Sequence, residues 1–88
     1  MIERRLQVRN RLGLHARAAA RFVHVASRFG ARVTVSRDGK SMDGKSILGI
    51  LLLAAGQGTL LAVTTDGEDE AAAMDALAEL VDGGFGEG

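Results

Sequence analysis

The feature that most constrains the fold is a change of hydrophobic period across residues 10–18. Before it, Ile2, Leu6 and Val8 alternate with polar residues, as in a strand with one buried face. After it, apolar residues recur every three or four positions, as in an amphipathic helix. A strand that leads so soon into a helix needs a short connection, and Gly13 supplies its flexible point.

The next elements are a helix and a hairpin. The helix is expected over residues 16–28 and is expected to end at Gly30 through a glycine cap. Its core stripe comprises Ala19, Phe22, Val23 and Ala26. Strands are then predicted over residues 31–37 and 40–43, because the first is rich in β-branched residues and an Asp-Gly pair at 38–39 favours a tight turn.

Ser46 opens an apolar segment over residues 47–55, whose composition alone allows a strand or a helix. A serine N-cap and alanines at the end favour a short helix. The segment is apolar on all sides, so in a small domain part of it must stay near the surface, as partner sites often do. We expect Ile47, Leu48 and Leu51 to contribute a contact surface; the alternative is a helix that is simply well buried.

The last third predicts a strand, a turn and a helix. The strand is expected over residues 59–65 and the turn at 66–67, and acidic residues at 68–70 suit the positive end of the helix that follows. The core stripe of this helix comprises Ala73, Leu77, Leu80 and Val81. Two glycines at 83–84 end the helix, and residues 85–88 are expected to form a loose tail.

The elements follow in the order strand-helix-strand-strand-helix-strand-helix, within the 88 residues of one small domain. This order predicts an α+β fold in which a four-stranded antiparallel sheet carries three helices on one face. The other face would be open to water. Its polar side chains are expected to include Glu3, Gln7, Arg32 and Thr34.

Composition excludes several classes of function. Eleven basic and eleven acidic residues give zero formal net charge, and three phenylalanines are the only aromatic residues, which disfavours nucleic-acid binding. No cysteine is present and no metal-ligand spacing occurs. The apolar runs are too short to span a bilayer, and no charged-then-apolar leader opens the chain. We expect a cytoplasmic protein with no metal, cofactor, nucleic-acid or membrane partner.

His15 stands where the loop gives way to the helix. Histidine is a poor N-cap, so its place there calls for a reason. The first backbone N–H groups of the helix, those of Ala16, Arg17 and Ala18, and its positive dipole end would bind an anion and keep the imidazole neutral and nucleophilic. The Arg17 guanidinium can clamp phosphate oxygens. These residues predict a phosphoryl acceptor at His15; the alternative is a surface histidine that happens to start a helix.

Two segments resemble the signatures of one family. Residues 13–17 (GLHAR) resemble the phosphorylation-site signature of HPr, the histidine-containing phosphocarrier protein of the phosphoenolpyruvate-dependent phosphotransferase system. Residues 44–49 (GKSILG) resemble the serine-site signature, at the separation usual in the family. The likeness covers nearly the whole chain. It implies an open-faced β-sandwich, a single HPr-like domain over residues 1–88, and a carrier that is not itself an enzyme.

The resemblance also implies partners. Phosphorylated Enzyme I would give a phosphoryl group to Nδ1 of His15, and an Enzyme IIA-type acceptor would receive it. An ATP-dependent kinase, HPr kinase/phosphorylase, would phosphorylate Ser46 for regulation; otherwise Ser46 is only an N-cap. The family usually has proline where this chain has Ala18, and we expect His15 to stay competent with a slightly looser helix start.

A docking surface is expected around the two signatures, and a monomer is expected. The expected surface comprises Arg17, Ala20, Arg21, His24, Ile47, Leu48 and Leu51. The basic stripe on the first helix could equally be an ordinary solvated face, and His24 receives no catalytic role. Three other functions stay open: a nitrogen-type or purely regulatory carrier, an interaction module in which His15 is incidental, and, least favoured, a hydrolase.

Overall fold

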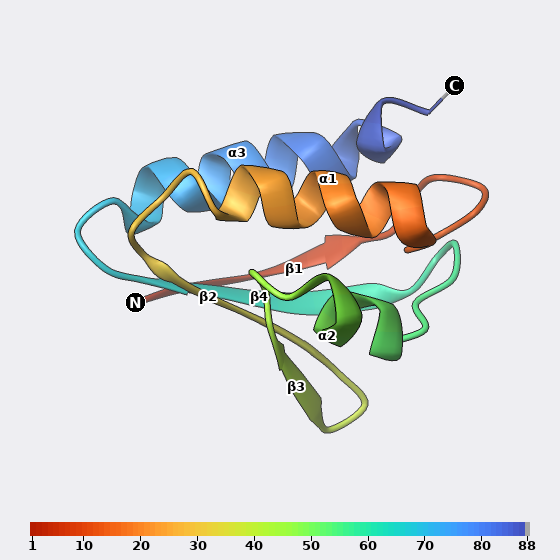
Figure 1. Ribbon diagram of the computed structural model, residues 1–88, viewed down its shortest axis with the longest axis horizontal. Helices are drawn as coiled ribbons and strands as arrows, with labels where there is room; N and C mark the ends of the chain where they lie inside the picture. Colours follow the sequence, from red (N-terminus) through yellow and green to blue (C-terminus); the bar gives the residue numbers. More distant parts are fainter. Residues whose placement is uncertain (88) are drawn as a thin grey trace.

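The computed structural model describes residues 1–87, and within them the predicted order of four strands and three α-helices is confirmed. The elements are β1 (Ile2–Gln7), α1 (Ala16–Ala26), β2 (Arg32–Arg37), β3 (Lys40–Asp43), α2 (Ile47–Leu52), β4 (Leu60–Asp66), α3 (Glu70–Asp82) and a 3-10 turn, η1 (Gly84–Gly86). The strands form one antiparallel sheet in the order β1-β4-β2-β3 (Figure 1).

One face of the sheet carries the core. Leu61 pairs with Leu6 across β1 and β4, and Val63 pairs with Val35 across β4 and β2, so that apolar side chains line the same face. All three helices contribute to this core. Its helical members include Phe22 of α1, Ile50 of α2 and Leu77 of α3. The opposite face is polar: Glu3, Gln7 and Arg32 are exposed there and Thr34 is half-buried.

The hairpin turn has the backbone that its sequence predicts. Asp38 and Gly39 both have positive φ angles, 50° and 82°, as a tight turn between twisted strands requires. Ser36 and Ser41 lie opposite each other beside this turn, and their hydroxyl oxygens are 2.8 Å apart. The short strand β3 is therefore fixed in register at the edge of the sheet.

The predicted end of the first helix is wrong. α1 ends at Ala26 with Ser27 as its C-cap, and not through Gly30. The backbone N–H groups of Gly30 and Ala31 instead donate to the two carboxylate oxygens of Asp69, at 2.9 and 2.8 Å. These bonds lower the pKa of Asp69, and the bond from Gly30 contributes most. Asp69 thus ties the start of α3 to the strand that follows α1.

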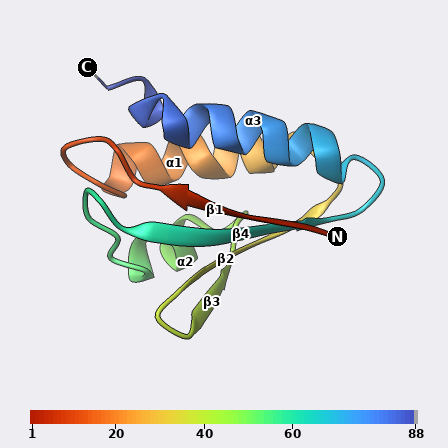
Figure 2. The same cartoon turned by 180° about the vertical axis from the view of Figure 1, so that it is seen from behind.

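The loose tail predicted for residues 85–88 is also wrong for residues 85–87; residue 88 lies outside the described residues. α1 and α3 run side by side in opposite directions, so the end of α3 returns to the start of α1 (Figures 1 and 2). Phe85 turns back into the core with only 1% of its surface exposed, and Arg21 of α1 donates to the Phe85 carbonyl oxygen. Burial of one aromatic side chain holds the glycine-rich segment in place.

Replacing Phe85 by alanine should therefore destabilise the protein strongly. Emptying a fully buried phenylalanine site costs about 3–5 kcal/mol in the free energy of unfolding. Phe29→Ala is the matched control, because Phe29 is only half-buried and should cost clearly less. Urea denaturation of both variants measures the difference. Equal losses would show that the C-terminal segment does not belong to the core.

Candidate functional site

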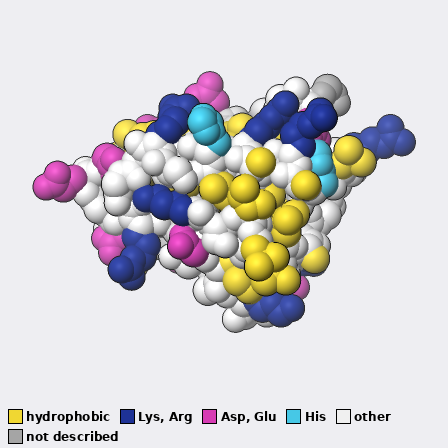
Figure 3. Space-filling model, viewed as in Figure 1, with side chains coloured by type: hydrophobic (Ala, Val, Ile, Leu, Met, Phe, Trp, Pro, Cys, Tyr) yellow, Lys and Arg dark blue, Asp and Glu magenta, His cyan; other side chains and the backbone are white. Residues whose placement is uncertain are grey.

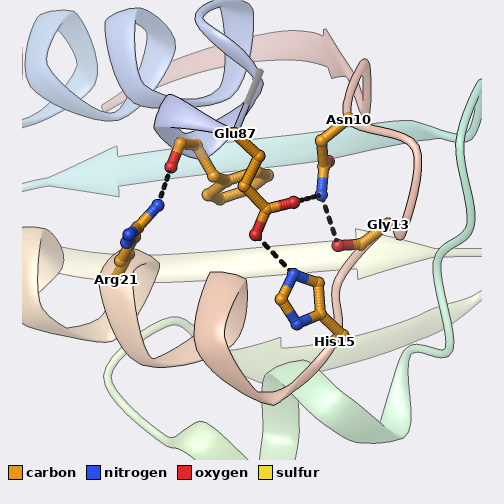
Figure 4. A network of polar contacts seen from close by, with 6 residues as sticks. Asn10, Gly13, His15, Arg21 and Glu87 are labelled. Atoms are coloured by element: carbon orange, nitrogen blue, oxygen red, sulfur yellow. Dashed lines mark hydrogen bonds and ion pairs between the residues drawn. The ribbon is translucent and has the colours of Figure 1, made fainter.

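Two hydrogen bonds and one close backbone approach fix the loop between β1 and α1. The buried side-chain amide of Asn10 donates to the carbonyl oxygen of Gly13 at 2.8 Å (Figure 4). The Leu14 N–H donates to the carbonyl oxygen of Ala55 at 2.9 Å. Gly13 has φ 66°, and a Cβ there would lie 2.5 Å from that same Ala55 oxygen. Both the backbone angle and the available space therefore require glycine at position 13, two residues before His15.

His15 occupies the N-cap position of α1. Its backbone is extended, with φ −74° and ψ 177°, and its carbonyl oxygen accepts the first helical hydrogen bond from Ala19 at 2.9 Å. The side chain makes no capping bond, so the ring is available for other contacts. No hydrogen bond among residues 1–87 uses the N–H groups of Ala16, Arg17 and Ala18. The start of the helix therefore keeps three donors free next to a partly exposed imidazole.

Glu87 contacts the imidazole from the C-terminal segment. The ring Nε2 lies 2.5 Å from its Oε2, and the Asn10 amide donates to its Oε1 at 2.9 Å (Figure 4). The Asn10 hydrogen bond, followed by the His15 contact and the nearby charge of Arg21, lowers the pKa of Glu87 below its ordinary value. The carboxylate is therefore ionised at neutral pH. It joins the loop, the helix start and the chain end in one network.

Sequence reasoning missed Glu87. It sits 72 residues from His15, in a segment whose glycines indicated looseness. The one available signal was Phe85, a large apolar residue after a helix stop, which indicates a return to the core. Nothing in the sequence marked Asn10, whose amide joins Glu87 to the loop.

Basic residues surround this network on the outside. Arg17 and Arg21 are exposed on α1. Together they line a surface hollow whose other members are Arg11, Leu12, Gly86 and Glu87. Ala18, which stands where the family usually has proline, is fully buried, while Ala20 and His24 are exposed. An anion that approaches the free N–H groups would meet guanidinium groups beside them.

The exposed apolar surface lies over α2. Leu48 is 68% exposed, Leu52 56% and Ile47 45%, whereas Leu51 is half-buried. Figure 3 shows hydrophobic side chains gathered over this helix. We call Ile47, Leu48, Leu51 and Leu52 the apolar patch; Leu52 was not among the predicted contact residues. The helix ends at Leu52, earlier than the predicted segment, so Leu52 stands free at its last turn.

Ser46 caps α2, as its sequence position predicts. Its Oγ accepts from the Gly49 N–H at 3.1 Å, and its side chain is half-buried next to the apolar patch. The neighbouring Lys45 ammonium donates to the carbonyl oxygen of Phe29 at 2.7 Å. The loop before Ser46 and the first turn of α2 therefore hold the serine at the edge of the patch.

Residues 1–87 contain no group of three His, Cys, Asp or Glu side chains placed to hold a metal ion. No helix among them has the length and apolar character needed to cross a membrane.

Comparison with known proteins decides the family. A family model described as the PTS HPr component phosphorylation site matches residues 2–82. The chain belongs to the HPr family. A phosphocarrier protein HPr of Xylella fastidiosa is 51% identical over 87 residues, which cover 99% of this chain and 98% of the relative. That of Neisseria meningitidis is 47% identical over 88 residues, or 100% and 99% of the two chains.

A solved HPr structure shows the same fold. HPr-C-His from Thermoanaerobacter tengcongensis superposes with a TM-score of 0.96 at 41% identity, covering 100% of this chain and 99% of that one. The predicted open sheet with three helices is confirmed, and so is the resemblance seen in the two signatures. As an HPr, the protein has a phosphocarrier role in the phosphotransferase system.

Adding a side chain at Gly13 should damage the histidine loop of this HPr. In Gly13→Ala the alanine must adopt the positive φ of Gly13, and its Cβ meets the Ala55 carbonyl oxygen. Backbone strain of this kind costs about 1–3 kcal/mol in the free energy of unfolding. Gly56→Ala is the control, because no atom lies within 4 Å of its added Cβ. Thermal unfolding of both variants tests the expectation. A Gly13 variant as stable as the control would contradict the need for glycine.

Proposed function

We propose that His15 accepts a phosphoryl group on Nδ1 from phosphorylated Enzyme I and passes it to a histidine of an Enzyme IIA-type acceptor. The observation that carries the proposal is the place of the ring, partly exposed at an N-cap whose next three N–H groups are free. Those groups and the helix dipole stabilise the anionic phosphoryl oxygens. Arg17 is the side chain proposed to clamp them.

The proposed site suits a carrier more than an enzyme that acts by itself. Phosphoryl transfer needs mainly positioning and charge stabilisation, which backbone donors and one or two guanidinium groups supply. A site that held the phosphoryl group too tightly would slow its departure to the acceptor. The shallow, solvent-facing arrangement at His15 meets both demands, and Enzyme I and the acceptor supply the remaining groups.

Partner docking is proposed on two neighbouring surfaces. The first is the exposed face of α1 that bears Arg17, Ala20, Arg21 and His24. The second is the apolar patch on α2, which packs beside α1. An apolar centre next to guanidinium groups fits a partner that presents apolar side chains flanked by acidic ones. Both partners are proposed to use this surface in turn, and the protein is proposed to act as a cytoplasmic monomer.

Ser46 is proposed as a regulatory phosphorylation site for an HPr kinase/phosphorylase. A phosphate there would place a dianion next to Ile47 and Leu48, which are exposed and apolar. It would oppose a partner with acidic side chains without dismantling the fold. If Ser46 is only an N-cap, its hydroxyl contributes about 1 kcal/mol to stability and nothing to regulation.

The second candidate is a nitrogen-type or purely regulatory carrier, phosphorylated at the same histidine. It differs in its acceptors and not in the site. A panel of acceptors from one cell, offered to the phosphorylated protein, separates it from a carrier for sugar uptake.

Replacing His15 by alanine should abolish acid-labile phosphorylation. The wild type, incubated with phosphoenolpyruvate and Enzyme I, should show one phosphoramidate signal by ³¹P NMR. His15→Ala should show none. Arg32→Ala, on the open face of the sheet, should keep the wild-type rate. A signal that persists in His15→Ala would move the phosphoryl group to His24 and overturn the proposal.

A negative charge at Ser46 should weaken the complex with Enzyme I. We expect Ser46→Asp to raise the dissociation constant roughly tenfold, which corresponds to about 1.4 kcal/mol. Ser46→Asn is the matched control, because asparagine caps a helix as well as aspartate but carries no charge. Calorimetry measures both affinities. If the two variants bind equally well, the charge does not block docking.

A further inference from the structure

Glu87 contacts the ring nitrogen that the proposed transfer leaves unused. Its Oε2 lies 2.5 Å from Nε2 of His15, whereas Nδ1 is the proposed acceptor. The carboxylate is held in place by a hydrogen bond to its second oxygen and by the anchored chain that precedes it. Asn10 donates to its other oxygen, and the preceding chain is anchored by buried Phe85 and by the Arg21 bond to the Phe85 carbonyl.

We propose that Glu87 is a positioning residue for His15, which fixes the proton on Nε2, leaves the lone pair on Nδ1, and balances the charge of the phosphorylated ring. This proposal rests on the proposed function of His15. The arrangement has the same logic as a carboxylate that orients a catalytic histidine and stabilises its imidazolium form.

The Glu87 carboxylate acts on the positive charge that the His15 ring gains during transfer. In the acceptor step, the Nδ1 lone pair forms the N–P bond while the donor's N–P bond breaks and its electron pair returns to the donor nitrogen. The proton stays on Nε2, so the ring of His15 becomes cationic beside Glu87. In the next step the N–P bond breaks and its electron pair returns to Nδ1. A ring that leaves as neutral imidazole is a better leaving group than an anion.

The charges around the contact explain why a carboxylate is needed. Arg17 and Arg21 approach from α1, and Arg11 approaches from the loop; all three line the hollow that Glu87 also lines. α2 carries no titratable side chain. The three guanidinium groups stabilise phosphoryl oxygens but oppose a cationic ring, and Glu87 offsets that repulsion.

The contact persists through the neutral range. Because the pKa of Glu87 is lowered in the folded protein, its carboxylate is charged well below neutral pH. The contribution of the charge is present above the unfolded-state pKa and is lost as the pH falls through the lower, folded-state pKa. A change in transfer between pH 6 and 8 would therefore not come from Glu87 itself.

The decisive experiment compares the wild type with Glu87→Gln, Glu87→Ala and the control Glu79→Gln, whose side chain is exposed on α3. Nitrogen-15 NMR of unphosphorylated His15 reads the tautomer directly, without any partner. The wild type and the control should hold the proton on Nε2. Glu87→Ala should show both tautomers in fast exchange, whereas Glu87→Gln keeps an amide oxygen that accepts from Nε2–H and so removes the charge alone.

Transfer kinetics with Enzyme I supply the second readout. Both Glu87 variants should lower kcat by about tenfold, the scale of one charge-assisted hydrogen bond, while KM stays unchanged because the docking surface is intact. A merely structural role would leave the tautomer alone. An unchanged tautomer in Glu87→Ala, or an unchanged kcat in both variants, would overturn the proposal. If the wild type accepts no phosphoryl group, the proposed function of His15 fails, and the tautomer populations still decide whether Glu87 positions the ring.

Discussion

The packing of α1 into the core is the interaction on which the site depends. Ala18, Ala19, Phe22 and Ala26 are all buried, and three of these four are alanines. Small side chains let the helix lie close to α2 and α3, and the one large ring fills space in the core. The direction of the helix then determines where its free N–H groups point. The backbone of His15 is placed by the core, because the helix start to which it belongs is held there.

The return of the chain end to that helix start adds the other half of the site. α3 runs antiparallel to α1, so its C-terminal end lies at the end of α1 where free donors and positive dipole occur. Gly84, Phe85 and Gly86 all have positive φ angles, and they bend the chain over the start of α1. The energy that holds this bend comes from burying Phe85. A carboxylate two residues later is thereby brought to the histidine without a helix or strand of its own.

Local patterns predicted what local forces determine. The hairpin at Asp38, the Ser46 cap and the place of His15 all follow from interactions among residues close in sequence. The end of α1 and the role of Glu87 do not, because Gly30 bonds to Asp69, 39 residues away, and Glu87 reaches back 72 residues. Gly30 indicated a helix cap, and the glycines around Glu87 indicated looseness. Propensity describes the chain without its neighbours, and tertiary hydrogen bonds reversed the outcome.

The exposed apolar patch lowers the stability of the free protein. Leaving Leu48 and Leu52 in water forgoes about 1.5–3 kcal/mol for each side chain that burial would bring. The core compensates with large, fully buried side chains on every helix. A partner of the proposed kind would recover that energy only while it covers the patch. The proposed exchange of two partners on one surface requires short-lived complexes, so the exposure is better explained by that exchange than by incomplete packing.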